Sequence, residues 1–169
     1  MRIVIDGYNL IRRVPELRAL DREDLEAGRE TLVRELSAYR AGKGHRITVV
    51  FDGAESLHLG GGSERVAGIS VRYSPRGRSA DSIIREMCRE GKAEVVVTGD
   101  REIVDTAKRW GTTAVSPELF WDRVQEEMYR KLKGEEEEEE QEEGKRGKGE
   151  KGRKLSKELR RDRGWIEKL

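Results

Sequence analysis

The chain has 169 residues, of which 41% are charged and 34% are hydrophobic, and its formal net charge is +1. This length normally supports one domain with a single core, so we do not expect a second full domain. The near-neutral charge excludes the strongly basic domain that is the usual electrostatic signature of nucleic-acid binding. Any positive surface must therefore be local.

The compartment is indicated by the cysteine content and by the first residues. Cys88 is the single cysteine, so the chain has no intramolecular disulfide and needs no oxidising compartment. The chain begins with a strand-like run, without the basic and apolar succession of a signal peptide. No apolar stretch approaches the roughly 18 residues of a membrane span. We therefore expect a cytoplasmic protein without a membrane partner.

The first third of the chain predicts a strand followed by a helix. A short apolar, β-branched run from Arg2 to Asp6 predicts the strand, and Gly7 and Asn9 after it predict a loop. From Leu20 to Ala41, apolar residues recur at helical spacing among Arg and Glu, ahead of glycines that act as stop signals. This pattern predicts one amphipathic helix.

Strand and helix patterns alternate through the rest of the chain as far as about Leu132. Ile47–Phe51 is a continuous apolar run, which is typical of a strand buried on both faces, and it ends at Asp52 and Gly53. The predicted strands are Ile47–Phe51, Ile69–Tyr73, Glu94–Thr98 and Thr112–Val115, and the predicted helices are Ser79–Glu90, Arg101–Trp110 and Pro117 to about Leu132. This alternation predicts an α/β fold with a central, mostly parallel sheet and helices on both faces, in which ligands bind beyond the carboxyl ends of the strands.

The composition changes at Gly134, which ends the predicted domain of residues 1–133. Six consecutive glutamates and then Gly- and Lys-rich sequence offer no apolar residue to bury, so residues 134–154 are predicted to be a disordered acidic linker. Residues 155–169 regain apolar residues at helical spacing among many basic ones. They predict a basic C-terminal segment that is either a short helix or an arm that orders only on a partner.

Four aspartates occupy positions that a parallel sheet brings to one edge. Asp6, Asp52 and Asp100 follow predicted strands, and Asp81 lies in the first turn of a predicted helix. Mutual repulsion there would raise their pKa values or require a cation. Hard oxygen ligands suit Mg²⁺ or Mn²⁺, and a metal at such a site suits phosphodiester hydrolysis. The alternative is that these aspartates are only turn and capping residues.

Four segments in this order resemble the YacP-like NYN domain family over roughly residues 1–133. They are residues 5–11 (Ile-Asp-Gly-Tyr-Asn-Leu-Ile), 49–53 (Val-Val-Phe-Asp-Gly), 73–84 (Tyr-Ser-Pro-Arg-Gly-Arg-Ser-Ala-Asp-Ser-Ile-Ile) and 95–103 (Val-Val-Val-Thr-Gly-Asp-Arg-Glu-Ile). The resemblance implies a PIN-like, Rossmannoid three-layer sandwich and metal-dependent endoribonuclease activity. One branch of the family is a ribosome-associated enzyme that acts on messenger RNA.

The resemblance also implies roles for individual residues. Asp6, Asp81 and Asp100 would be metal ligands, and Asn9 and Asp52 would complete the catalytic site. Relatives commonly have Thr-Ser-Asp where this chain has residues 98–100, Thr-Gly-Asp. A hydroxyl that supports the site is therefore missing, unless Thr98 supplies it.

Contacts with RNA are predicted at three side chains. Arg76 and Arg78 flank Gly77 just before the helix of Asp81, and the planar guanidinium fork suits phosphate. Tyr8 would stack on a base of single-stranded RNA, although core packing is an equal alternative.

Two other functions compete with that of a nuclease. The first is an RNA- or ribosome-binding protein that keeps the fold, cleaves poorly and uses the basic C-terminal segment as its main contact. The second is a phosphatase for small phosphoesters, which we rank last. The Asp-x-Asp pair of one large phosphatase class is absent, because Tyr8 takes the second place.

Overall fold

The structure is a computed structural model that describes residues 1–53 and 61–144, with the backbone alone for residues 135–144. Residues Met1–Glu127 form a compact unit that holds the sheet. The elements are, in chain order, β1 (Arg2–Asp6), α1 (Gly7–Arg13), α2 (Pro15–Glu23), α3 (Leu25–Lys43), β2 (Arg46–Phe51), β3 (Gly62–Val66), β4 (Ile69–Tyr73), α4 (Ala80–Arg89), β5 (Val95–Val97), α5 (Arg101–Arg109), β6 (Thr113–Val115) and α6 (Pro117–Gly144).

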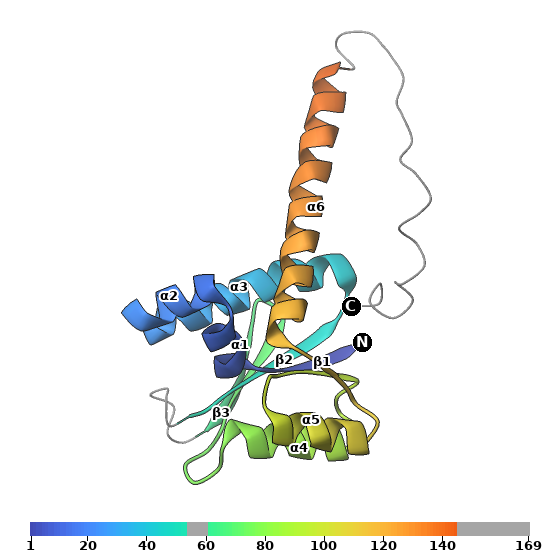
Figure 1. Cartoon of the computed structure of the whole chain (residues 1–169). Helices are drawn as coiled ribbons and strands as arrows, with labels where there is room; N and C mark the ends of the chain where they lie inside the picture. The colour runs from blue at the N-terminus through green and yellow to red at the C-terminus, as the bar shows by residue number, and fades with distance from the viewer. Residues whose placement is uncertain (54–60, 145–169) are drawn as a thin grey trace. The chain divides into compact units, whose positions relative to one another are not determined.

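The described strands form one six-stranded sheet in the order β3-β4-β2-β1-β5-β6. All neighbouring strands are parallel except β3 and β4, and Ile5 of the central strand β1 lies opposite Val49 on one side and Val97 on the other. Helices α4 and α5 cover one face, and α1 and α3 lie on the other (Figure 1). The predicted three-layer α/β fold with a mostly parallel sheet is confirmed.

The core has one layer on each side of the sheet. On one face, Val4, Val50 and Val96 pack against the apolar sides of α4 and α5. Ile3 and Ile5, which flank Val4 on β1 and so point to the opposite face, are fully buried as well. Because side chains alternate between faces along a strand, β1 must be apolar at every interior position, which is the pattern that its sequence shows.

Residues 7–13 are a helix, and the prediction of a loop after β1 was wrong. Asp6 caps α1 by accepting a hydrogen bond from the backbone N–H of Asn9 (3.3 Å), and Leu10 and Ile11 are fully buried. Gly7 had suggested a turn, but it serves close packing, because a Cβ there would overlap the ring of Phe51. A seven-residue helix is too short for its apolar period to be visible in the sequence.

The single helix predicted from Leu20 to Ala41 is two helices, α2 and α3. Pro15 starts α2 at a position where its missing N–H costs nothing. Asp24 has an extended backbone between the helices, and its side chain caps α3 by accepting from the N–H of Glu26 (2.8 Å). The apolar period continues across this break, so periodicity alone did not reveal it.

Strand β3 was not predicted. All five of its residues are exposed, so it has no apolar alternation by which a sequence reading finds strands. It pairs with β4 through a two-residue turn at Ala67 and Gly68, both with positive φ. Such turns match the twist of a hairpin, and charged side chains are common on exposed edges.

Helix α6 continues to Gly144, past the predicted end at about Leu132. It therefore takes up residues 134–144, which were predicted as part of the disordered linker, because glutamate has a favourable helix propensity and no proline interrupts the run. The rest of the predicted linker, residues 145–154, and the predicted basic segment, residues 155–169, lie outside the described residues. Among the described helices, none is long and apolar enough to cross a membrane.

Candidate active site

The carboxyl ends of three adjacent parallel strands, β2, β1 and β5, meet at one edge of the sheet. Asp6 ends β1, Asp52 follows β2, and Asp100 follows β5, while Asp81 enters from the first turn of α4. Together they line a cavity of about 400 Å³. The described residues that line it are Asp6, Tyr8, Asn9, Arg12, Arg13, Asp52, Ser79, Ala80, Asp81 and Asp100. The structure thus brings all five predicted catalytic residues to one place.

Asp6 is the most deeply buried of the four carboxylates, with 6% of its surface exposed. Burial raises its pKa from 3.8 to about 6, against the opposing effect of two hydrogen bonds, and the charges of Asp81 and Asp100 raise it further. Its Oδ1 accepts from the N–H of Asn9 (3.3 Å) and its Oδ2 from the hydroxyl of Thr98 (3.0 Å). A cation in the cavity would favour the ionised form of Asp6 and so offset the effects of both its burial and its charged neighbours.

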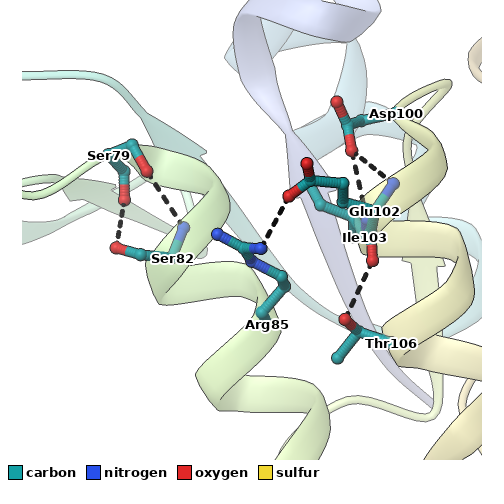
Figure 2. Close-up of polar contacts among 7 residues, drawn as sticks. All are labelled: Ser79, Ser82, Arg85, Asp100, Glu102, Ile103 and Thr106. Atoms are coloured by element: carbon teal, nitrogen blue, oxygen red, sulfur yellow. Dashed lines mark hydrogen bonds and ion pairs between the residues drawn. The ribbon is translucent and has the colours of Figure 1, made fainter.

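Asp81 is held at the cavity by the start of α4. Burial raises its pKa, the nearby Asp100 adds to the shift, and Arg85 opposes it. Figure 2 shows Ser79 capping this helix through the N–H of Ser82 (3.2 Å), and Arg85 donating to Glu102 of α5 (2.8 Å). The Ser79 cap shapes the start of α4, where Asp81 lies, and the Arg85–Glu102 pair connects the surfaces of α4 and α5.

Asp100 is both a helix cap and a wall of the cavity. Its Oδ1 accepts from the backbone N–H groups of Glu102 (2.8 Å) and Ile103 (3.1 Å). Figure 2 shows its second carboxylate oxygen pointing away from these two donors. Capping, the alternative to a catalytic role, therefore occupies only one oxygen of this side chain.

Thr98 supplies the hydroxyl that the Thr-Gly-Asp sequence had put in question. The side chain is buried, its Oγ1 donates to Oδ2 of Asp6 (3.0 Å), and the same oxygen accepts from the backbone N–H of Asp100 (3.1 Å). One hydroxyl thus connects a carboxylate of β1 to the chain after β5. The side chain at position 99 is not required for this support.

Asn9 joins α1 to the end of β5. Its Oδ1 accepts from the backbone N–H of Gly99 (2.8 Å), which orients the amide and holds the helix against the strand end. A Cβ at Gly99 would lie 3.1 Å from Nη2 of Arg13 and 3.3 Å from Oδ1 of Asn9, closer than most real contacts. A side chain at this position would therefore require small shifts of the Arg13 and Asn9 side chains.

The structure does not bring Arg76 or Arg78 to this cavity. Arg76 is exposed, and Arg78 pairs with Glu86 and lines a second cavity together with Arg72 and Lys92. A tight turn at Gly77, whose φ is 83°, is closed by a hydrogen bond from the N–H of Arg78 to the carbonyl of Pro75 (3.0 Å). Arg76 and Arg78 are therefore close to Asp81 in sequence but do not line the cavity of the four aspartates.

Tyr8 is part of the core, which was the alternative to base stacking. Only 4% of its surface is exposed, and its ring packs edge-on against Phe51 at 5.1 Å between centroids. Its hydroxyl accepts from Nη1 of Arg29 (3.0 Å), and the guanidinium of Arg12 lies 5.3 Å from the ring centroid. A ring covered in this way offers no open face to a nucleobase.

Arg12 and Arg13 line the cavity and were missed in the sequence. They belong to α1, which had been taken for a loop, so the four-residue spacing that aligns them with Tyr8 and Asn9 on the helix was not considered. A helical interpretation of residues 7–13 would have placed both arginines beside the strand-end carboxylates.

The carboxylates surround the cavity without forming a closed metal cage. Within residues 1–53 and 61–134, no three His, Cys, Asp or Glu side chains are arranged to hold a metal ion by themselves. The donors at the cavity are hard carboxylate oxygens that repel one another. They fit a divalent cation such as Mg²⁺, which commonly keeps several waters and uses only one or two carboxylates with a substrate phosphate.

Comparisons of the sequence and of the structure with known proteins both find similarity to YacP. The family model described as the YacP-like NYN domain matches residues 3–163. The uncharacterized protein YacP of Bacillus subtilis (strain 168) is 30% identical over 88 residues, which cover 50% of this chain and 49% of that protein. The chain therefore spans about half the length of the curated relative that it matches.

Two solved structures share the fold. The crystal structure of Rae1 (YacP) from Bacillus subtilis aligns with a TM-score of 0.62 and 21% identity, over 82% of this chain and 83% of that one. The crystal structure of a mutant of the same Bacillus subtilis protein aligns with a TM-score of 0.63 and 22% identity, over 76% of this chain and 77% of that one. At these identities the likeness establishes the arrangement of sheet and helices.

Proposed function

The chain belongs to the YacP-like NYN domain family, and from this premise we propose that it is a metal-dependent endoribonuclease. NYN domains are in general PIN-like nuclease domains. The observation that carries the proposal is the convergence of four aspartates on one cavity, with the pKa of Asp6 raised to about 6. Burial and like charges disfavour the ionised form of a carboxylate, and a bound cation offsets both effects. Groups whose pKa is shifted in this way cluster at functional sites.

In this proposal Mg²⁺ or Mn²⁺ would bind among Asp6, Asp81 and Asp100, to one or two of these carboxylates at a time, while water and a substrate phosphate would complete its shell. Asp52 and Asn9 lie beside them. When bound, such a cation supplies a Lewis acid for the phosphate and lowers the pKa of a bound water. Thr98 and the N–H of Asn9 keep the Asp6 carboxylate in place, and the start of α5 does so for Asp100. The reaction is attack of water on phosphorus in line with the leaving 3′-oxygen, which yields a 5′-phosphate and a 3′-hydroxyl.

The choice of RNA over other phosphodiesters is supported by family membership. NYN nuclease domains act on RNA in general, and the resemblance to a ribosome-associated branch extends the proposal to messenger RNA decay. Single-stranded RNA is the substrate we propose. Most of the described residues that line the cavity are polar or charged, which suits contacts with the phosphate backbone of RNA.

The test is cleavage of labelled single-stranded and structured RNAs by the full chain with Mg²⁺, Mn²⁺ or EDTA. We expect cleavage with either metal and none with EDTA. Asp6→Asn and Asp81→Asn should each lower the rate by at least about a hundredfold, since even residues that only support metal ligands matter by about 10- to 100-fold. Asp105→Asn is the matched control, because Asp105 is exposed on α5 and does not line the cavity.

Two results would count against this function. Cleavage that survives EDTA, or that survives both substitutions, would exclude the carboxylate mechanism. RNA binding without any cleavage under all three conditions would favour the alternative, an RNA- or ribosome-binding protein with a PIN-like fold.

A further inference from the structure

The carboxylate cavity has a basic side that no prediction had assigned. Of the described side chains that line it, Arg12 and Arg13 alone are cationic, and they face four aspartates across the same space. An RNA backbone entering the cavity brings more negative charge to a place that already repels it. Positive groups at the rim would lower that barrier.

Arg12 is held over a fixed aromatic surface. It follows Tyr8 by four residues on α1, so the two side chains are neighbours on the helix. The guanidinium lies 5.3 Å from the ring centroid, within the range of a cation–π contact, and the ring itself is buried. Stacking restricts the plane of the guanidinium, while Arg12 as a whole stays exposed to solvent.

The Arg13 guanidinium has Gly99 and Glu118 as neighbours. It lies over Gly99, at the end of β5, and its Nη1 pairs with Oε1 of Glu118 at 3.5 Å. The side chains of this pair are 53% and 49% exposed. An exposed ion pair at this distance contributes little stability, so a phosphate can replace the glutamate as partner at small cost.

We propose that Arg12 and Arg13 bind a phosphate of the RNA backbone next to the four aspartates and so place the strand across the cavity. The planar fork of arginine donates two parallel hydrogen bonds to phosphate oxygens, which a lysine does not reproduce. The choice of RNA as the ligand rests on the proposed ribonuclease function of this cavity. Its measurement, RNA binding, does not depend on cleavage.

The experiment measures the affinity of the full chain for a fluorescent single-stranded RNA over salt concentrations of about 50 to 200 mM. Ca²⁺ replaces Mg²⁺, and the RNA is checked on a gel to be intact. The variants are Arg12→Gln, Arg13→Gln and the double substitution, because glutamine is a good helix former and keeps α1 intact. Arg109→Gln, exposed at the far end of α5, is the matched control.

We expect each single variant to bind about tenfold more weakly, as for loss of a charged hydrogen bond. The double variant should also lower the slope of log affinity against log salt by about 0.7, the value for one phosphate contact on a single strand. Arg13→Lys should keep the slope but lose part of the affinity. A melting temperature equal to that of the wild type would show that the fold is retained.

The outcomes separate this proposal from the proposed function. Binding in Ca²⁺ that depends on both arginines, together with no cleavage in Mg²⁺ or Mn²⁺, would support the phosphate site and contradict the nuclease. Cleavage that depends on Asp81, together with wild-type affinity and slope in the double variant, would support the nuclease and overturn the phosphate site. A wild-type chain that does not bind RNA would also overturn it.

Discussion

Asp6 stabilises the fold as the cap of α1, whereas the charge that the proposed reaction requires of it destabilises the fold. It caps α1, yet burial raises its pKa from 3.8 to about 6. The folded state therefore holds the proton more tightly than the unfolded state, and its stability falls as the pH rises from about 4 to about 6. Above this range the ionised carboxylate costs about 3 kcal/mol by the two pKa values, as an order of magnitude.

The first prediction follows from this loss of stability as the pH rises. In metal-free buffer, Asp6→Asn should raise the free energy of unfolding at about pH 8 and have little effect near pH 4, because asparagine keeps the cap without the charge. Urea unfolding at both pH values measures the difference, with Asp105→Asn as the control. Mg²⁺ should stabilise the wild type at the higher pH more than the variant. Equal effects of the substitution at the two pH values would show that the carboxylate's charge is not the cause.

The second prediction concerns Thr98. Thr98→Val keeps the shape but removes the donor to Asp6 and the acceptor for the N–H of Asp100, so it should destabilise the fold by about 1 to 3 kcal/mol. It should also raise the pKa of Asp6 further, since this hydrogen bond favours the ionised form. Thr98→Ser keeps the hydroxyl and should change both quantities less. A carboxylate titration by NMR that gives the same Asp6 pKa in the two variants would contradict the assignment.

Helix α1 is the element on which the candidate site depends most. It carries Asn9, Arg12 and Arg13, starts at the cap of Asp6 and lies directly on Phe51. The contact with Phe51 is possible only because residue 7 has no Cβ. A larger residue there would push the helix, and with it three cavity side chains, away from the strand ends.

The third prediction is therefore that Gly7→Ala destabilises the protein. Alanine normally stabilises a helix by about 1 kcal/mol over glycine. Here its Cβ overlaps the Phe51 ring, and overpacking of this kind costs about 1 to 3 kcal/mol. Gly134→Ala in α6 is the matched control, since nothing lies within 4 Å of its Cβ. Thermal unfolding compares the two, and a stabilised Gly7→Ala protein would show that α1 does not need this contact.

At the scale of the whole molecule, the candidate site and the described core lie in the unit Met1–Glu127. In α6, Phe120, Trp121 and Val124 are buried, whereas Tyr129 and Leu132 are exposed. The predicted linker and basic segment therefore follow the last side chains that the described core requires. This separation makes the role of the C-terminal part testable.

The fourth prediction is that a chain ending at Lys133 folds and, if the nuclease proposal holds, cleaves a short RNA within about twofold of the full-length rate, since changes away from buried features have small effects. Affinity for long RNA or ribosomes compares the two proteins. A selective loss of that affinity would identify the C-terminal part as a main contact, as the predicted basic segment requires. Loss of folding would contradict the independence of the first unit.

The sequence by itself determined the α/β class, the strands that are buried on both faces and the carboxylates at their ends. A continuous apolar run such as Ile47–Phe51 can be buried only between two layers. The aspartates that follow three of the parallel strands must reach the same edge of the sheet. These features are local in the chain, so periodicity reveals them. The family resemblance added the order of the motifs.

Only the tertiary structure decided which charged side chains accompany those carboxylates. Arg76 and Arg78 precede Asp81 in sequence but do not line the cavity, whereas Arg12 and Arg13 do, because a short helix capped by Asp6 turns them toward it. Likewise, only the folded structure shows that the hydroxyl of residue 98 contacts both the Asp6 carboxylate and the N–H of Asp100. The direction of a side chain depends on caps, turns and close packing between distant segments, and these are settled only when the chain is folded.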